Sequence, residues 1–342
     1  MDKQTFQQRL LTWYDMSKRI LPWRDNPDPY HVWISEIMLQ QTRVEAVIPY
    51  FEQFITVLPT IQDVASVDDD LLNKLWEGLG YYSRVRNIKK AAIKLTEEFD
   101  GKIPKTRKEL ESLPGIGPYT AGAILSIAFG IPDTAVDGNV LRVFARLTAN
   151  KNNIKDPTVK QDIRDMVQSL LPEKRVGDFN QGLMEIGATV CLPNGKPLCA
   201  RCPLNELCEA YQKGLVDEIP QKQKKQTRRI EERTVFVLSV GDKYVLYRRP
   251  DTGLLAGLYE FPNELGHISI ESMIQRYPSA TINVLDKSKH IFSHLEWHMI
   301  GYEIILEQAP NDGVLASKED LLARYSIPTA FKVYLKSILT KH

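Results

Sequence analysis

Apolar residues recur with helical spacing through the first two thirds of the chain. From residue 2 to about residue 212, short amphipathic segments are separated by Pro, Gly and Asp, and period-two alternation is almost absent. Thr106 and Glu109 have the spacing of a capping box, which marks a helix start before Leu113. Two apolar groups are predicted to form the core faces of helices: Leu71, Leu72, Leu75 and Trp76, and then Val140, Val143, Phe144 and Leu147. We therefore predict an all-helical domain over residues 1–212.

The pattern changes after this domain. Residues 213–232 are polar and nearly free of aromatic residues, which predicts a linker. The basic residues of its middle part are Lys222, Lys224, Lys225, Arg228 and Arg229. Beyond it, residues 234–240 and 244–247 are rich in β-formers and joined by Gly-Asp, and residues 289–306 offer more strand. Ser317 is predicted to cap a helix and Pro328 to open another, so residues 233–342 should form an α+β domain.

Composition and charge narrow the class of protein. The chain has 342 residues, of which 43% are hydrophobic and 25% charged, as in a soluble globular protein with two domains. The formal net charge is only +1, so any surface that binds nucleic acid must be a local basic patch. The N-terminus lacks a signal-peptide pattern, and no apolar run reaches about 18 residues. We expect a cytoplasmic protein with no membrane partner.

The four cysteines are clustered. They lie between Cys191 and Cys208, with seven, two and five residues between successive cysteines. In a reducing compartment such clustering favours metal ligation over disulfide bonds. Two separate C-x2-C pairs would suggest structural zinc, but only Cys199 and Cys202 form a close pair here. The spacing favours an iron–sulfur cluster, with zinc as the alternative, and the cluster can hold its loop against DNA without redox chemistry.

Residues 113–122, LPGIGPYTAG, place Gly115 and Gly117 between two helices. Both glycines are expected to adopt positive φ and to leave backbone N–H groups free to hold a phosphate at a helix N-terminus. Such a hairpin grips the DNA backbone without reading sequence. The small residues Ala121, Gly122 and Ala123 would let the second helix pack closely. The alternative is an ordinary corner between two helices.

Asp137 begins the next apolar helix, in the segment AVDGNVLR at residues 135–142. An Asp in this position is often only an N-terminal cap. At a helix N-terminus that faces DNA, its carboxylate would stay ionised and could stabilise an oxocarbenium ion developing on a deoxyribose. The two roles are compatible.

Glu36 is the single acid in the apolar segment HVWISEIMLQQT at residues 31–42. Partial desolvation would raise its pKa, which is the property that a general acid needs near neutral pH. The alternative is a buried Glu that pairs with an Arg. One protonated and one ionised carboxylate facing a substrate is the arrangement that cleaves glycosidic bonds, and an N-glycosidic bond breaks through a similar cation.

These segments, together with GLGYYSR at residues 78–84, resemble the helix-hairpin-helix DNA glycosylases and, among them, the MutY family. The resemblance covers roughly residues 5–212. It implies an enzyme that removes adenine paired with 8-oxoguanine or guanine in double-stranded DNA. We expect the enzyme to act as a monomer, because one lesion needs one pocket. It also implies one 4Fe-4S cluster held by Cys191, Cys199, Cys202 and Cys208. The family loop usually has six residues between its first two cysteines, and Gly195 is expected to absorb the seventh found here.

The resemblance assigns roles to further residues. Glu36 would protonate N7 of adenine and later assist water, Asp137 would stabilise or capture the sugar cation, and Tyr119 and Asn139 would support them. The residues implied for the flipped adenine are Trp23, Arg24 and Gln181, and those near the opened base stack and the lesion are Gln41, Leu79, Gly80, Tyr81 and Tyr82. For the aromatic residues the alternative is core packing, which suits Tyr82 better than Tyr81.

Two differences from relatives bear on activity. Endonuclease III carries a lysine in the hairpin that attacks the sugar, whereas this chain has Tyr119 there, so a monofunctional glycosylase is implied. The C-terminal part resembles the MutT-like, Nudix-fold domain through GLLAGLYEFP at residues 253–262, but the R-E-x-x-E-E run that binds magnesium is missing, so pyrophosphatase activity is not expected. Phe292, Ser293 and His294 would form the loop that contacts 8-oxoguanine. Its alternative is a hairpin with surface polar residues.

Three other interpretations remain at this point. A related glycosylase or lyase could act on oxidised pyrimidines or mismatched thymine, against which Tyr119 and the MutT-like domain argue. A non-catalytic DNA-binding protein would be unaffected when Glu36 is neutralised. A zinc-stabilised module would lack the absorbance at about 400 nm of an iron–sulfur protein. The sequence identifies no protein partner, such as a sliding clamp or a mismatch-repair protein.

Overall fold

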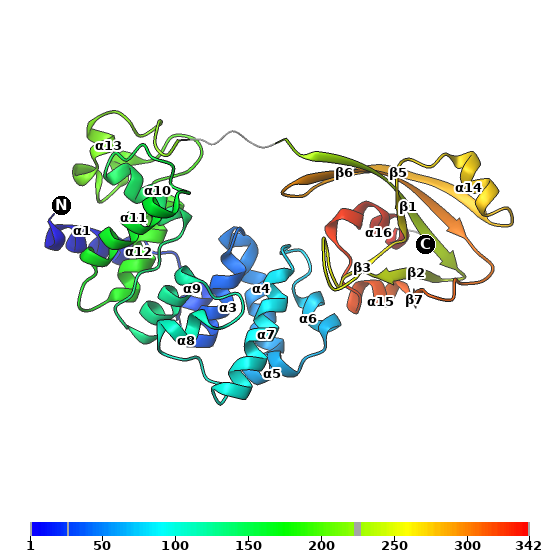
Figure 1. Ribbon diagram of the computed structural model, residues 1–342, viewed down its shortest axis with the longest axis horizontal. Coiled ribbons are helices and arrows are strands. Elements are labelled where there is room, and N and C mark those ends of the chain that lie inside the picture. Colours follow the sequence, from blue (N-terminus) through cyan, green and yellow to red (C-terminus); the bar gives the residue numbers. More distant parts are fainter. Residues whose placement is uncertain (1, 26, 222–226, 341–342) are drawn as a thin grey trace. The chain divides into compact units, whose positions relative to one another are not determined.

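Helices form the N-terminal part of the chain, as the hydrophobic spacing predicts (Figure 1). The structure is a computed structural model that describes residues 2–25, 27–221 and 227–340. The helices of this part are α1 (Lys3–Ser17), α2 (Pro22–Asp25), α3 (Pro29–Leu39), α4 (Val44–Val57), α5 (Ile61–Ser66), α6 (Asp69–Leu75), α7 (Ser83–Glu98), α8 (Arg107–Glu111), α9 (Pro118–Ala123), α10 (Gly138–Leu147), α11 (Pro157–Leu170), α12 (Val176–Thr189) and α13 (Glu209–Gln212). A π-helical turn, η1 (Ile124–Ala128), continues α9, and the loop after α12 contains the 3-10 turns η2 (Cys199–Arg201) and η3 (Asn205–Leu207).

Contacts between Cα atoms divide the chain into two units. The first unit comprises residues 1–66 and 86–223, and the second comprises residues 67–85 and 224–342. Helix α6 and the loop after it therefore group with the C-terminal part of the chain, whereas the sequence predicted one domain over residues 1–212. Local periodicity does not reveal this grouping, because it carries no information about which distant segment a helix contacts.

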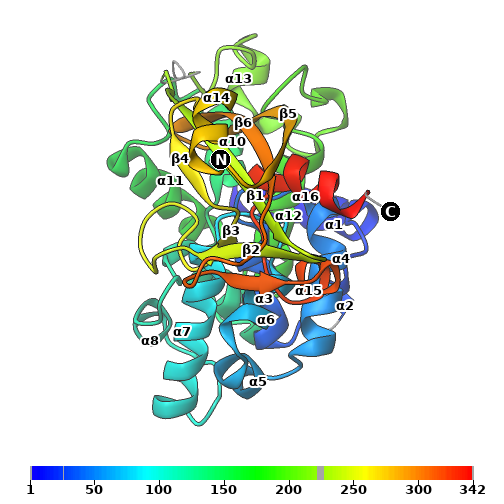
Figure 2. The same cartoon turned by 90° about the vertical axis from the view of Figure 1, so that its right-hand side faces the viewer.

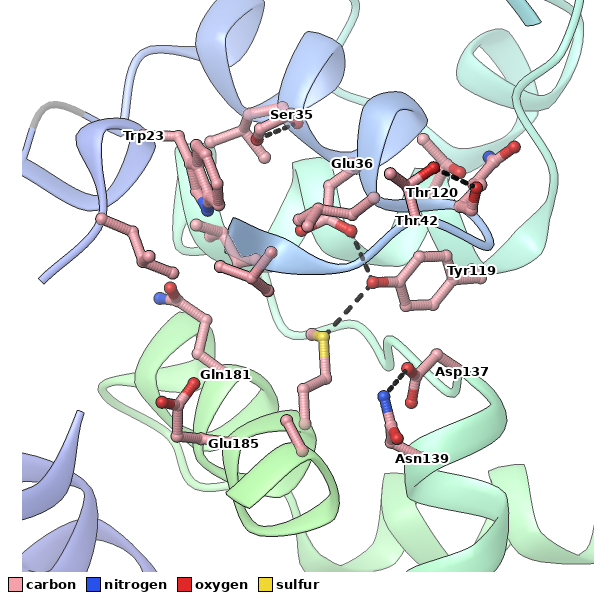
Figure 3. Close-up of a pocket in the computed structure, with 18 of the residues that line it drawn as sticks. Trp23, Ser35, Glu36, Thr42, Tyr119, Thr120, Asp137, Asn139, Gln181 and Glu185 are labelled. Carbon is pink, nitrogen blue, oxygen red and sulfur yellow. Dashed lines mark hydrogen bonds between the residues drawn. The ribbon is translucent and has the colours of Figure 1, made fainter. Parts of the chain in front are cut away.

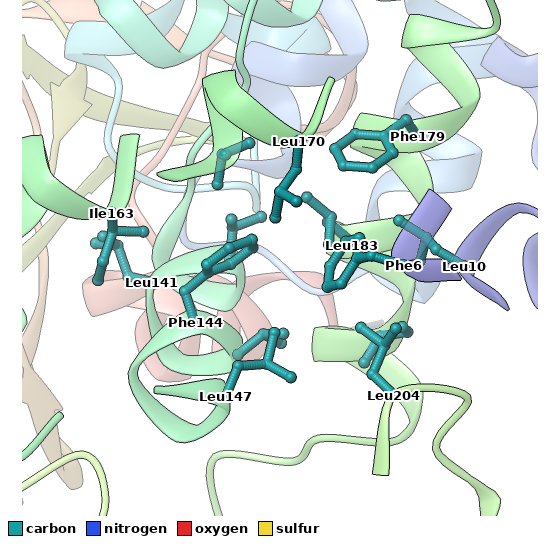
Figure 4. Close-up of a cluster of buried hydrophobic side chains, with 14 of the residues drawn as sticks. Phe6, Leu10, Leu141, Phe144, Leu147, Ile163, Leu170, Phe179, Leu183 and Leu204 are labelled. Carbon is teal, nitrogen blue, oxygen red and sulfur yellow. The ribbon is translucent and has the colours of Figure 1, made fainter. Parts of the chain in front are cut away.

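A hydrophobic core of the first unit lies between α1, α10, α11 and α12 (Figure 4). The ring of Phe6 from α1 lies 6.1 Å from that of Phe144 and 6.0 Å from that of Phe179, between ring centroids. Each fully buried side chain of this size contributes roughly 1.5–3 kcal/mol to the free energy of folding. The core face predicted on α10 is confirmed, since Val140, Val143, Phe144 and Leu147 are all buried.

The core face predicted around α6 is confirmed for Leu72, Leu75 and Trp76, which are buried, but it is wrong for Leu71. The side chain of Leu71 is 39% exposed. Residues 71 and 72 point to different sides of a helix, and only one side of this short helix is covered.

Polar caps begin several helices where the sequence places Asp or Thr. Asp28 caps α3 by accepting the N–H of Tyr30 at 2.8 Å, with Pro29 in the first turn. Thr106 caps α8 as predicted, since its hydroxyl accepts the N–H of Glu109 at 3.3 Å. The same hydroxyl donates to the Glu109 carboxylate at 2.6 Å, so the two residues of the predicted capping box are joined through their side chains.

The C-terminal part of the second unit is a mixed β-sheet with helices, which confirms the predicted α+β class (Figure 1). The strand order is β3-β2-β1-β6-β5, with β4 on β1 and β7 on β2, and among the strand pairs of the described residues only β1–β6 is parallel. The strands are β1 (Arg229–Val240), β2 (Lys243–Arg248), β3 (Tyr259–Glu260), β4 (Asn263–Leu265), β5 (Thr281–Ile291), β6 (Leu295–Ile305) and β7 (Val314–Ala316). The helices are α14 (Ile270–Arg276), α15 (Lys318–Ala323), the 3-10 turn η4 (Thr329–Phe331) and α16 (Lys332–Leu339).

Both faces of this sheet are covered, and the strand residues alternate between them. Val235 and Val237 of β1 pack in the cluster that contains Tyr334 of α16, whereas Phe236 and Leu238 pack in the cluster that contains Met273 of α14. The strand β1 crosses between α16 and α14 in Figure 2. Ser317 and Asp320 form a full capping box on α15, as the sequence predicted for Ser317.

The linker predicted over residues 213–232 is shorter in the structure. Ile219 is buried against Ala145 and Ala210 of the first unit, and its carbonyl accepts from Arg146 at 2.7 Å. At the other end β1 already begins at Arg229. Apolar residues in a polar stretch are enough to dock it, and the linker prediction is therefore wrong at both ends. The predicted basic residues Lys222, Lys224 and Lys225 lie outside the described residues. In the described ranges no helix is both long and apolar enough to cross a membrane.

Candidate active site

A cavity of about 690 Å³ in the first unit collects most of the residues predicted for the site (Figure 3). Its walls come from α2, α3, the hairpin before α9, the start of α10, and α12. The predicted residues that line it are Trp23, Arg24, Glu36, Gln41, Gly117, Tyr119, Asp137, Asn139 and Gln181. Folding thus brings together residues that are up to 158 positions apart, from Trp23 to Gln181.

Glu36 lies on α3 with its carboxyl in the cavity and only 6% of the residue exposed. Burial raises the pKa of Glu36 to about 7, since removal from water disfavours the charged form. The hydroxyl of Tyr119 donates to Glu36 Oε2 at 2.5 Å and opposes this rise of the pKa. The carboxyl of Glu36 can therefore carry a proton near neutral pH, as predicted from its apolar neighbours.

Tyr119 reaches Glu36 from the second position of α9, directly after the hairpin. Its hydroxyl also lies 3.3 Å from the sulfur of Met184 on α12. Burial and the nearby carboxyls of Glu36 and Asp137 hold the pKa of Tyr119 well above its usual range, so the phenol remains a hydrogen-bond donor at neutral pH.

Asp137 is the N-cap of α10, as one of its two predicted roles requires. Its Oδ1 accepts the N–H of Val140 at 2.8 Å, and its Oδ2 accepts from the Asn139 amide at 2.7 Å. Desolvation raises the pKa of Asp137 from its ordinary value, while these hydrogen bonds and the Arg142 charge lower it. The carboxyl of Asp137 also lines the cavity, so it can face a substrate while it caps the helix.

A chain of hydrogen bonds connects Asp137 to the cysteine loop. The Asn139 amide donates to Asp137, Asn139 Oδ1 accepts from Arg142 at 2.8 Å, and Arg142 Nε donates to the Cys191 carbonyl at 2.9 Å. Arg142 also donates to the carbonyl of Gly187 at 2.8 Å. Asn139 is therefore fixed between Asp137 and the loop that carries the cysteines.

Glu185 is a residue of the cavity that the sequence reasoning missed. It is 1% exposed, and its two carboxylate oxygens accept from Arg19 at 2.6 Å and from Arg24 at 2.7 Å. These arginines hold the pKa of Glu185 below its ordinary value despite burial. The alternative in which an Arg pairs with Glu36 is wrong, because Arg24 forms its ion pair with Glu185 instead. A single acid in the helical segment FNQGLMEIGAT was the available signal.

The other predicted pocket residues have distinct surroundings. Trp23 is buried and packs edge-on against Phe51, with 5.3 Å between ring centroids. Gln181 projects into the cavity from α12 (Figure 3). Gln41 follows α3 with φ of 59°, a left-handed conformation that is uncommon for a residue other than Gly and that turns the chain along the cavity rim.

The hairpin before α9 differs from prediction at one glycine. Gly115 has φ of 81°, as expected, but Gly117 is extended with φ of −101°, so the predicted positive φ is wrong there. Gly117 is the N-cap of α9, and a cap residue takes extended backbone. A Cβ added to Gly117 would meet no atom within 4 Å, so its backbone is open to a ligand, whereas a Cβ on Gly122 would lie 1.8 Å from the Thr134 carbonyl oxygen. Close packing of the second helix is thus confirmed.

The four cysteines line one small cavity together with Val143, Leu147 and Ile186. None is in a disulfide bond, and Arg146 Nη1 donates to Cys191 Sγ at 3.2 Å. Burial raises the pKa of Cys202 to about 12. Within the described residues no three His, Cys, Asp or Glu side chains already form a group that could hold a metal ion. The donor set of four sulfur atoms around one cavity nevertheless fits a thiolate-bound cluster.

Of the residues predicted near the opened base stack and the lesion, all but Gln41 belong to the second unit. Leu79 and Tyr82 are buried, which agrees with core packing for Tyr82, while Tyr81 is 48% exposed. Phe292, Ser293 and His294 form the turn between β5 and β6. The ring of Phe292 packs against Trp297, with 4.9 Å between ring centroids, and Ser293 and His294 are exposed.

Comparison with known proteins agrees with this geometry. Residues 34–169 match the HhH-GPD superfamily of base excision DNA repair proteins, and residues 234–337 match the NUDIX domain. The adenine DNA glycosylase of Mus musculus is 38% identical over 90% of this chain and 72% of the mouse protein. That of Buchnera aphidicola subsp. Baizongia pistaciae is 36% identical over 89% of this chain and 87% of its own length.

Solved structures resemble the helical part of the chain. A thermostable thymine-DNA glycosylase superposes with a TM-score of 0.57 at 29% identity, over 62% of this chain and 97% of that one. An endonuclease III in a non-covalent DNA complex gives a TM-score of 0.53 at 26% identity, over 63% of this chain and 99% of that one. Together with relatives at more than a third identity over about nine tenths of this chain, these likenesses show that the chain belongs to the adenine DNA glycosylases, enzymes of base-excision repair that act on DNA.

Proposed function

We propose that this enzyme hydrolyses the N-glycosidic bond of adenine paired with 8-oxoguanine, or with guanine, and that it does not cleave the DNA strand itself. The observation that carries the proposal is the cavity with two carboxyls of different character: Glu36, whose pKa is about 7, and Asp137, at the N-terminus of α10. Tyr119 occupies the hairpin position where a lysine would attack the sugar. A phenol with a raised pKa does not form a Schiff base, so no lyase step follows.

In the proposed reaction the protonated Glu36 gives its proton to N7 of the flipped adenine. The C1′–N9 bond then breaks, its electron pair leaves with the neutral base, and positive charge develops on the deoxyribose. The ionised Asp137 stabilises that charge, and water adds to C1′ while Glu36, now ionised, accepts a proton from it. Tyr119 orients the Glu36 carboxyl, and Asn139 holds the Asp137 carboxylate through its hydrogen bond.

The remaining lining residues bind the base and the DNA in this proposal. Trp23 offers a flat apolar surface, and Arg24, fixed by Glu185, and Gln181 offer hydrogen bonds to the edge of a flipped adenine. Gln41 lies on the rim, where the opened base stack would be. The hairpin with Gly115 and Gly117 would hold a phosphate through backbone N–H groups, since the space beside Gly117 is open.

A single-turnover assay on duplexes tests the proposal. On an 8-oxoguanine:A duplex, strand breaks are expected only after alkali and only at the adenine, because base removal leaves a strand that alkali must cleave. Matched duplexes with thymine glycol or a G:T pair should remain intact. Breaks without alkali, or on the pyrimidine duplexes alone, would assign the protein to a bifunctional or pyrimidine-directed glycosylase.

We also propose that Tyr81 and the turn Phe292–Ser293–His294 recognise 8-oxoguanine. Two observations support this role: the exposed Ser293 and His294 follow Phe292, whose ring packs against Trp297, and the Tyr81 hydroxyl lies 3.2 Å from Ser293 Oγ. A hydroxyl can accept the N7–H that distinguishes 8-oxoguanine from guanine. Leu79 and Gly80 shape the loop that carries Tyr81.

Replacing both Ser293 and His294 with alanine should lower the preference for 8-oxoguanine over guanine opposite adenine. We expect about a tenfold loss, because a specific base contact contributes roughly 1–3 kcal/mol to discrimination. The measurement is the ratio of single-turnover rates on the two duplexes, with Ser279→Ala, at another exposed turn, as the matched control. An unchanged ratio would move recognition to other residues.

Finally, we propose that Cys191, Cys199, Cys202 and Cys208 hold one 4Fe-4S cluster. The cluster would cross-link the loop after α12 and support it beside DNA, and Arg146 beside Cys191 would offset part of the negative charge of the thiolates.

The expected result for this site is a purified protein with absorbance at about 400 nm, and with iron and acid-labile sulfide in equal amounts. Cys202→Ala should remove the absorbance and lower the temperature of unfolding, because the loop loses its cross-link. Zinc without this absorbance would contradict the assignment.

A further inference from the structure

The loop between α6 and α7 in the second unit has an unusual backbone. Gly78, Gly80 and Tyr81 have φ of 108°, 70° and 48°, all in the left-handed region. Tyrosine rarely adopts positive φ, since its Cβ then crowds the backbone, and such a residue persists only where its surroundings fix it. The side chain that this backbone holds outward, Tyr81, is half-exposed.

From inside the loop, two residues fix this conformation. Trp76 Nε1 donates to the Gly80 carbonyl at 3.1 Å, and Arg84 Nη2 donates to the carbonyls of Leu79 and Gly80, both at 3.0 Å. The Arg84 guanidinium carbon also lies 5.2 Å from the centre of the Trp76 ring and 5.8 Å from that of Tyr81. Arg84 therefore supports both the backbone and the ring of the loop.

A second set of bonds joins the same segment to the C-terminal part of the second unit. Lys74 Nζ donates to the carbonyls of Leu321 and Tyr325 at 3.2 and 3.3 Å. Glu77 Oε1 accepts the N–H of Ile327 at 2.9 Å, and its other oxygen lies 2.6 Å from Lys74 Nζ. We call Lys74 and Glu77 the clamp.

The hydrogen bonds of the clamp are partly shielded from water. The side chains of Lys74 and Glu77 are 17% and 24% exposed, so these charge-assisted bonds are only partly screened by water. Lys74 and Glu77 both bond backbone groups of residues 321–327. The clamp therefore fixes how this segment lies against the segment that carries Lys74 and Glu77. Tyr82 adds a buried bond between its hydroxyl and Ser326 Oγ at 3.2 Å.

We infer that the Lys74–Glu77 clamp determines specificity by holding the Tyr81 loop in register with the Ser293 turn, so that the two form one preassembled reader of the base opposite adenine. The hydrogen bond between the Tyr81 hydroxyl and Ser293 Oγ, at 3.2 Å, is the point where the two parts meet. Preassembly limits the ordering cost of recognition, so the clamp strengthens discrimination. Lys74 and Glu77 are positioning residues that act through Tyr81 and Ser293, and the inference rests on the proposed role of those two.

The test compares Lys74→Met with Lys94→Met in the full-length protein. Methionine keeps the aliphatic stem of lysine, and Lys94 bonds the Ser112 carbonyl at 3.1 Å in the first unit, so the control removes a similar bond elsewhere. At enzyme concentrations below saturation, Lys74→Met should lower the ratio of single-turnover rates on 8-oxoguanine:A and G:A duplexes by about fivefold, the factor that corresponds to one typical net hydrogen bond. The rate on 8-oxoguanine:A at saturating enzyme should hardly change, since Glu36 and Asp137 lie in the first unit. Lys94→Met should leave the ratio unchanged.

Two further measurements make the outcome decisive. Glu77→Gln keeps an acceptor for the N–H of Ile327 but loses the charge pair with Lys74. It should lower the rate ratio less than Lys74→Met does, and the variant should unfold at the same temperature as the wild type. In a double-mutant cycle, Lys74→Met should have little further effect once Ser293→Ala is present, because the clamp acts through Ser293.

A rate ratio that survives both clamp substitutions, or additive effects of Lys74→Met and Ser293→Ala, overturns the inference. A wild-type protein that shows no preference between the two duplexes overturns the proposed recognition of 8-oxoguanine, and the clamp inference with it.

Discussion

Glu36→Gln is expected to abolish detectable turnover while binding to a mispair duplex remains close to that of the wild type. The glutamine side chain has the shape of the acid but cannot give a proton to N7 of adenine, and general acid catalysis contributes about 10²–10⁴-fold to rate. Glu36 lies in the cavity, and the amide of glutamine fills the same space as the carboxyl. The substitution therefore removes no DNA contact, and the affinity for the duplex should be retained. Single-turnover rates and equilibrium binding to a non-cleavable duplex measure the two quantities separately.

The pH dependence of the wild type provides a second measurement of the same residue. Because the pKa of Glu36 is about 7, the acid form is lost as the pH rises through that value, and the rate should fall there. The same raised pKa lowers the free energy of unfolding of the wild type at high pH, and the variant lacks this effect. A carboxyl whose pKa is raised on folding destabilises the protein once the pH exceeds its unfolded value of 4.5, and fully so above about 7.

Glu36→Gln should therefore unfold at a temperature no lower than the wild type at pH values above about 7. Lost activity together with lost duplex binding would count against Glu36 as the acid, because it would indicate a structural defect.

Asp137→Asn is expected to slow base removal by about 10²–10³-fold at unchanged stability. Asparagine still caps a helix well, so the bond to the Val140 N–H is retained, but the negative charge that stabilises the sugar cation is lost. Loss of one preorganised electrostatic group of this kind typically costs roughly 3–4 kcal/mol of barrier. The measurement is the single-turnover rate on an 8-oxoguanine:A duplex, with thermal unfolding alongside.

Asp156→Asn is the matched control for this prediction. Asp156 caps α11 by accepting the N–H of Thr158 at 2.8 Å and is exposed outside the cavity, so its substitution tests the loss of charge at a cap alone. A near-normal rate for Asp137→Asn would reduce Asp137 to a cap. The variant should also lower the pKa of Glu36, since the Asp137 charge raises it, and shift the pH profile to lower pH.

The local features of the active site could be predicted from the sequence. The single acid among the apolar residues of α3 was enough to predict that Glu36 has a raised pKa, because desolvation follows from neighbours on the same helix. The position of Asp137 before an apolar-periodic helix predicted its cap. Helix spacing, the strand-forming residues 234–240 and the Ser317 cap were equally local, and the structure agrees with them.

Partners across the chain were decided only by tertiary structure. Tyr119 bonds Glu36 from 83 positions away, and Arg24 pairs with Glu185, 161 positions away, and not with Glu36. The single acid in residues 179–189 marks Glu185, but its local pattern does not show which arginines it meets.

The sequence by itself therefore determined the helical class of the N-terminal part, the α+β class of the C-terminal part, several helix caps, and which acid lies in an apolar setting, since these depend on neighbours within a few residues. The tertiary structure decided the exposure of Leu71, the extended backbone of Gly117, the docking of Ile219 and the joining of Lys74 to residues 321–325. Each of these depends on which distant surface covers a residue, and that choice is made by packing.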